Sequence, residues 1–179
     1  MVLAKAHFLY RFSICTISLL LFTLSSTTEA APSSQRHALV PRVRGLTAQA
    51  KLPSQNVTVK YDARLIKAAN IAKSKARSHS IKRCWRFVKR ALLEAEVIDY
   101  YPKTAYAKQA AKELPNNFGF ARIPVSDPFD APIGAVLVYG GRGAGHVEIR
   151  TKEGFVSDFT SNTPSKRPLI GVFVKPASM

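Results

Sequence analysis

The chain has 179 residues, about one domain with a short appendage. Hydrophobic residues make up 46% and aromatic residues 9%, which excludes a wholly disordered protein, a collagen-like fibre and a disulfide-dense miniprotein. Lys and Arg number 27 against 11 Asp and Glu, a formal net charge of +16, and two cysteines exclude a zinc site built from four cysteines.

The first 30 residues have the pattern of a secretory signal peptide. Lys5 and Arg11 precede an apolar stretch, residues 12–24, that is too short to span a bilayer comfortably. Residues 28–30 then place small side chains at the −3 and −1 positions of a cut after Ala30. An uncleaved N-terminal anchor is the alternative. We therefore expect a secreted or periplasmic protein with no transmembrane segment after cleavage.

Cleavage would leave a single thiol in a strongly basic chain. Loss of Lys5, Arg11 and Glu29 lowers the net charge from +16 to +15. Loss of Cys15 leaves Cys84 as the only cysteine. A lone cysteine in an exported protein is half of an intermolecular disulfide, an inert buried residue or a reactive thiol.

Next in chain order come a linker and three helices. Residues 31–59 are expected to be a flexible linker, because prolines and polar residues leave no sustained periodicity there. A domain over residues 60–179 follows. Apolar side chains at helical spacing predict helices over about 61–76 and 80–98, and an alanine-rich stretch predicts a third over 103–114, before Pro115.

Strands dominate the rest of the chain. Four short β-rich runs are separated by connections of hairpin length. Because the helices come first and the strands second, we expect an α+β domain with a mostly antiparallel sheet. The predicted strands cover residues 133–139, 146–151, 155–160 and 169–175.

Cys84 lies near the start of the second predicted helix. A helix N-terminus carries partial positive charge and unpaired N–H groups, and both favour the nucleophilic thiolate. Basic residues flank the cysteine at Lys82, Arg83 and Arg86, against the usual preference for acidic residues in a first turn. The alternative is a cysteine packed as a small hydrophobic residue, since it shares the apolar stripe of the helix.

His146 is the histidine best placed to act with that cysteine. It opens a predicted strand directly after the glycine-rich residues 140–145. Hydrolysis by a Cys–His pair needs an imidazole within hydrogen-bonding reach of the sulfur and a third group that orients the imidazole. Of the other histidines after the predicted cleavage site, His37 lies in the linker and His79 just precedes the Cys84 helix.

A hairpin supplies candidates for the third group. If residues 152–154 form a three-residue loop, Glu148 lies opposite Asp158, and both share a face with His146. A two-residue loop would move Asp158 to the other face, and a solvated polar face with a chance histidine is the alternative. The cysteine and histidine spacing matches no metal motif, so we expect no metal and no cofactor.

Three segments and one residue resemble the NlpC/P60 and CHAP group of papain-like cell-wall cysteine hydrolases. Residues 83–88, Arg-Cys-Trp-Arg-Phe-Val, resemble the nucleophile segment. Residues 131–139 resemble the proline, glycine and apolar strand before the histidine, and residues 145–149 resemble the histidine strand. Asp158 matches the third position. The resemblance spans roughly residues 62–176.

The resemblance implies a papain-like fold, with helices packed on a small antiparallel sheet and the nucleophile at a helix N-terminus. It implies that Cys84 attacks an amide carbonyl and forms an acyl-thioester, while His146 activates the sulfur and protonates the leaving amine. Asp158 would orient His146, although Glu148 stays open for that role. The implied substrate is peptidoglycan or its stem peptides. We expect Trp85, Tyr139 and Glu148 to bind it.

The charge fits a second function class. A domain of this charge is attracted to an anionic wall. The alternative function is therefore a non-catalytic basic module that binds an anionic cell-wall polymer. We expect a monomer that does not bind nucleic acid, because export removes the usual target and no motif of interleaved basic and aromatic residues is present.

Overall fold

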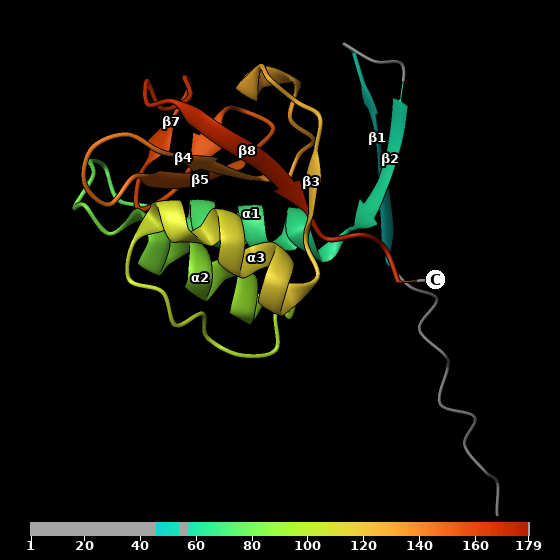
Figure 1. Cartoon of the computed structure of the whole chain (residues 1–179), viewed down its shortest axis with the longest axis horizontal. Helices are drawn as coiled ribbons and strands as arrows, with labels where there is room; N and C mark the ends of the chain where they lie inside the picture. Colours follow the sequence, from blue (N-terminus) through green and yellow to red (C-terminus); the bar gives the residue numbers. More distant parts are fainter. Residues whose placement is uncertain (1–45, 54–56, 179) are drawn as a thin grey trace, which may run out of the picture. The chain divides into compact units, whose positions relative to one another are not determined.

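The computed structural model describes residues 46–53 and 57–178 (Figure 1). The predicted signal peptide and the first part of the predicted linker, up to residue 45, lie outside the described residues. Within the described ranges, the chain has the predicted α+β class, with an antiparallel sheet. None of the described helices combines the length and hydropathy needed to cross a membrane.

The main sheet has six antiparallel strands in the order β3-β8-β4-β5-β6-β7. Every residue of the central strand β4 is fully buried, so the centre of the sheet is shielded from solvent. The strands are β3 (Ala121–Ile123), β4 (Val136–Tyr139), β5 (His146–Arg150), β6 (Phe155–Val156), β7 (Thr160–Ser161) and β8 (Leu169–Val174).

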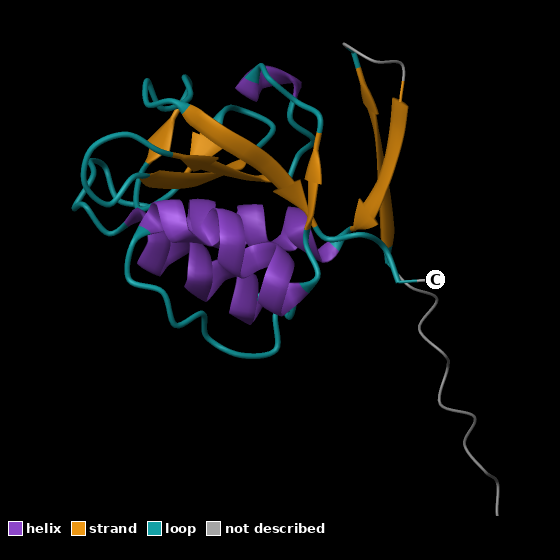
Figure 2. Cartoon of the chain, in the orientation of Figure 1, coloured by secondary structure: helices purple, strands orange, loops and turns teal. Residues whose placement is uncertain are grey.

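Three helices lie together along one face of this sheet (Figure 2). They are α1 (Arg64–Lys75), α2 (Cys84–Glu94) and α3 (Ala110–Phe118). Both predicted apolar stripes are buried: α1 buries its leucine and alanine face, and α2 buries Val88 and Leu92. The core therefore lies between the helices and the sheet. Two 3-10 turns, η1 (Ala107–Gln109) and η2 (Pro128–Asp130), lie in the connections.

The predicted linker is wrong from residue 47 onward. Strands β1 (Thr47–Leu52) and β2 (Val57–Asp62) pair as an antiparallel hairpin. Pro53 lies just after β1, so it does not interrupt the pairing. Tyr61, at the end of β2, is 2% exposed and donates a hydrogen bond to the carbonyl of Ile133 (2.9 Å). This buried anchor keeps the end of the hairpin on the domain.

The third helix was predicted too early in the chain. Residues 107–109 form the turn η1, and α3 continues through Pro115. Leu114 and Phe118, four residues apart, are both buried, and this packing outweighs the backbone hydrogen bond that the proline removes. The helix ends at Gly119, whose φ of +68° favours glycine. The short strand β3, which the sequence did not indicate, follows.

The hairpin of β5 and β6 differs from its prediction by one residue. Arg150 pairs with Phe155 and Ile149 with Val156, so the loop has four residues, 151–154, rather than three. The Thr151 amide donates to the carbonyl of Gly154 and closes this loop (2.8 Å). Because β6 ends at Val156, the chain reverses over residues 157–159 into β7. Asp158 therefore lies in a turn and not opposite Glu148.

Candidate active site

Cys84 is the first residue of α2 and is partly buried against the core. Arg83 stands at the N-cap but makes no side-chain capping bond, and the first turn contains no acidic residue. The positive end of the helix dipole therefore acts at the sulfur without an acidic side chain in that turn to oppose it.

His146 opens β5 and comes from the other half of the sequence. Gly145 before it has φ +76°, and a Cβ there would lie 2.5 Å from the carbonyl oxygen of Tyr139. Only glycine fits this close turn, which fixes where β5 begins. The His146 side chain is 15% exposed, and Cys84 and Glu148 both raise its pKa, so the sulfur lies near the ring. The fold thus brings together the two residues that the sequence singled out.

Glu148 holds one nitrogen of the imidazole. Its carboxylate is 5% exposed, and Oε2 lies 3.2 Å from His146 Nε2. The other oxygen, Oε1, accepts hydrogen bonds from the Tyr139 hydroxyl (2.6 Å) and the Ser165 amide (3.2 Å). With both oxygens engaged, the carboxylate has a fixed position, and so has the ring beside it.

This environment makes the imidazole basic. Burial alone would lower the pKa of His146, but hydrogen bonds to Cys84 and Glu148, with their charges, raise that pKa to about 9. The ring is therefore protonated at neutral pH. Burial also raises the pKa of Tyr139, and the adjacent Glu148 raises it further, so its hydroxyl stays a donor.

Asp158, predicted to orient His146, binds elsewhere. It is fully buried, and its Oδ2 accepts hydrogen bonds from the amides of Ile81 (2.8 Å) and Arg83 (3.0 Å). The hydroxyl of Ser80 also donates to Oδ2 (3.2 Å). Burial would raise the pKa of Asp158, but these amide bonds hold it below its usual value. The predicted orienting contact is replaced by one to the segment before Cys84.

That segment is strained at Lys82. Its φ of +60° lies in the left-handed region, which costs a residue with a Cβ about 1–2 kcal/mol. The amides on either side of it, those of Ile81 and Arg83, are the ones that Asp158 binds. The buried carboxylate thus stabilises the bend that leads into Cys84.

Trp85 and Tyr139 do not lie where a substrate could touch them. Trp85 is 3% exposed in the core and donates its indole N–H to the hydroxyl of Thr104 (3.1 Å). Tyr139 is fully buried beneath Glu148. Because both side chains are buried, the prediction that Trp85 and Tyr139 bind substrate is corrected. Glu148, predicted to bind substrate as well, faces His146 rather than solvent.

The sequence did not point to Ser80 or Ser165 as parts of this site. Both are single polar residues in irregular segments, so no periodicity marks them. Only the folded chain brings Ser80 to Asp158 and Ser165 to Glu148. Among the described residues, no three His, Cys, Asp or Glu side chains cluster as a metal site would require.

Comparison with known proteins bears on the fold. No protein-family model and no curated protein sequence matches this chain. A chain of the crystal structure of the type VI native effector–immunity complex Tae3–Tai3 from Ralstonia pickettii is 24% identical, with a TM-score of 0.50. The match covers 62% of this chain and 98% of that chain. A selenomethionine structure of that complex gives 26% identity over 52% and 80%, with a TM-score of 0.41.

Proposed function

We propose that this chain is a secreted or periplasmic cysteine peptidase or amidase of papain-like fold that hydrolyses amide bonds of peptidoglycan. The observation that carries the proposal is that Cys84, at a helix N-terminus, lies near a protonated His146. A thiol beside an imidazolium at a helix N-terminus is the arrangement that activates cysteine nucleophiles.

The reaction would run through an acyl-thioester. The Cys84 thiolate attacks the amide carbonyl, and a backbone N–H at the start of α2 stabilises the oxyanion. The C–N bond breaks as His146 gives its proton to the leaving amine. His146 then takes a proton from water, which attacks the thioester and releases the acid, and the sulfur leaves as thiolate.

Two carboxylates would act as positioning residues. Glu148 engages Nε2 of His146, which leaves Nδ1 for the sulfur and the leaving amine. Asp158 binds the two amides before α2 and so fixes the backbone from which the Cys84 side chain extends. In this proposal Glu148 takes the role that the sequence prediction gave to Asp158.

Peptidoglycan is the proposed substrate on three grounds. The segments around Cys84 and His146 resemble those of NlpC/P60 and CHAP hydrolases, and the first 30 residues have the pattern of an export signal. The net charge of +15 that remains after cleavage suits an anionic wall. The fold shared with a chain of the type VI complex accords with this proposal.

The test uses purified sacculi and the substitution Cys84→Ala. The wild-type protein is expected to lower the turbidity of a sacculus suspension, and Cys84→Ala is expected to lose this activity while still binding sacculi. Equal lysis by the variant would reject Cys84 as nucleophile. If neither protein cleaves sacculi but both bind, the chain is the non-catalytic basic module.

A further inference from the structure

A hollow of about 260 Å³ opens beside His146. Its lining joins three segments that are distant in sequence: Ser80 before α2, His146 on β5, and Thr163, Ser165 and Arg167 in the β7–β8 loop. The hollow thus offers hydroxyl groups and one guanidinium directly beside the proposed catalytic histidine. The one carboxylate in the lining, that of Glu148, is already engaged by its neighbours.

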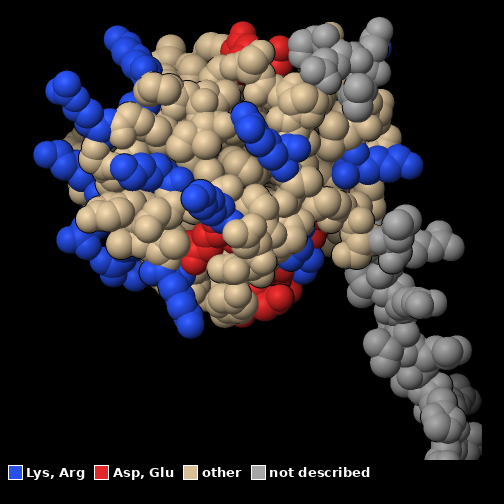
Figure 3. Space-filling model, viewed as in Figure 1, with Lys and Arg blue, Asp and Glu red and all other residues tan. Residues whose placement is uncertain are grey.

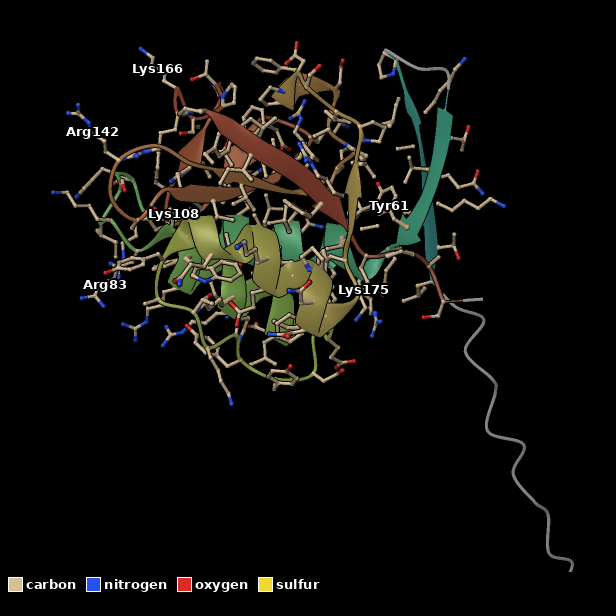
Figure 4. The ribbon with its side chains drawn as sticks, viewed as in Figure 1. Tyr61, Arg83, Lys108, Arg142, Lys166 and Lys175 are labelled. Atoms are coloured by element: carbon tan, nitrogen blue, oxygen red, sulfur yellow. The ribbon has the colours of Figure 1, made fainter. Side chains whose placement is uncertain are left out.

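Exposed cations surround this hollow and the start of α2. Arg167 donates to the carbonyl of Arg142 (2.9 Å), and the amide of Lys108 donates to the carbonyl of Ala144 (2.9 Å), so these loops meet. In Figure 4, Arg83, Lys108, Arg142 and Lys166 all extend at the end of the molecule where α2 begins. We define the basic rim as the exposed residues Lys82, Arg83, Lys108, Arg142, Lys166 and Arg167.

No carboxylate neutralises the basic rim in the part of the chain that the structure describes. The Lys and Arg ion pairs there use Asp62, Glu94 and Glu153, and none involves a rim residue. The nearby Glu148 and Asp158 are buried and bound within the fold. Figure 3 shows Lys and Arg, but no Asp or Glu, along the left edge, where this end lies.

Unpaired like charges repel one another, and a ligand of opposite charge relieves that repulsion. We propose that the basic rim and the hollow bind free carboxylates of the wall peptides on either side of the amide bond presented to Cys84. This proposal rests on the proposed function and adds the substrate class: a peptide with carboxylates close to the scissile bond. Arg167 would meet the carboxylate that enters the hollow.

The test measures binding without cleavage. On the Cys84→Ala background, the substitutions Lys108→Gln, Arg142→Gln and Lys166→Gln remove three rim charges whose side chains make no described hydrogen bond. Sedimentation with purified sacculi in 50 mM NaCl should show binding about tenfold weaker than that of Cys84→Ala alone. The difference should shrink in 500 mM NaCl, because salt screens exposed charges.

A matched control removes the same charge elsewhere. Lys51→Gln, Lys60→Gln and Lys67→Gln lie on β1, β2 and α1 and should change binding less than about twofold. Equal loss in both triple variants would overturn the proposal, since net charge alone would then explain binding. An unchanged affinity of the rim variant would overturn it as well.

The ligand chemistry is tested with sacculi whose carboxylates have been converted to amides. The rim-dependent part of binding should disappear on these sacculi, and its persistence would overturn the assignment to carboxylates and point to another anion, such as phosphate. The binding assay is independent of turnover. Lysis by Cys84→Ala would therefore reject the proposed nucleophile while the result for the rim stood on its own.

Discussion

His146 lies near a sulfur and a carboxylate, and these two neighbours set its protonation. With its pKa raised to about 9, the ring carries a proton throughout the neutral range. A raised pKa stabilises the fold fully below the unfolded value near 6.5, and this contribution is lost as the pH rises toward 9. Both the proposed proton donation to the leaving amine and part of the stability should therefore decline at alkaline pH.

Glu148→Gln tests what holds that proton. The amide keeps the shape of the side chain but removes the negative charge beside Nε2, so the pKa of His146 should fall by about one unit or more. The alkaline limb of kcat/KM should move to lower pH by the same amount. An alkaline limb at the wild-type pH would show that Glu148 does not set the charge of His146.

Asp158→Ala should destabilise the protein by about 2–4 kcal/mol, because it leaves two partly buried amides without their acceptor. Since the pKa of Asp158 is lowered on folding, its contribution is present above pH 4 and is lost as the pH falls through the folded value. Urea unfolding at pH 7 and pH 3 should show the variant's deficit shrinking in acid. Asp99→Ala, at an exposed carboxylate, is the control. An equal, pH-independent loss in both variants would contradict a stabilising role of the ionised Asp158 at these two amides.

Among single residues, the sequence identified Cys84 and His146 because each stands at the start of an element with distinctive neighbours. It did not separate the roles of the two carboxylates. Their faces depended on one loop residue, and the loop proved to have four residues rather than three. The strain at Lys82 and the contacts of Ser165 arise from long-range packing that leaves no local pattern.

Among the elements, the β4–β5 loop leaves little room at the residue before His146. Gly145 and Gly143 both have positive φ, +76° and +74°, but only at Gly145 would a Cβ meet other atoms, at 2.5 Å from the Tyr139 carbonyl oxygen. Gly143→Ala should cost about 1–2 kcal/mol from backbone strain alone. Gly145→Ala adds the cost of the clash, about 1–3 kcal/mol more, and should displace His146.

Thermal unfolding of these two variants, with sacculus lysis measured beside it, checks this prediction. The midpoint of Gly145→Ala should fall several degrees further than that of Gly143→Ala, with a larger loss of activity. Equal effects of the two substitutions would show that the start of β5 tolerates movement.

Helices α1 and α2 were predictable because each buries one clear stripe of apolar residues. Helix α3 was not, because its extent depends on core contacts that override Pro115. The β1–β2 hairpin was hidden by Pro53, which follows β1 rather than interrupting it. In each case the missing information was tertiary packing, which periodicity does not report.

For the whole molecule, the central feature is that α2, from the first half of the domain, and β5, from the second, meet at one end. The acidic residues at that end are buried and engaged, while the cations are exposed. Reactivity of Cys84 should therefore depend on the folded chain as a whole and not on its neighbours in sequence. Unfolding of the chain and removal of the imidazole should therefore both lower the reactivity of the Cys84 sulfur.

The most direct measurement is the rate at which iodoacetamide alkylates Cys84 at pH 6. An ordinary thiol, with a pKa near 8.5, is almost entirely protonated there and reacts slowly. We expect the native protein to react about tenfold faster or more than the urea-unfolded chain, and His146→Ala to lose most of that advantage without unfolding. Equal rates for the native, unfolded and His146→Ala proteins would contradict a Cys84–His146 pair.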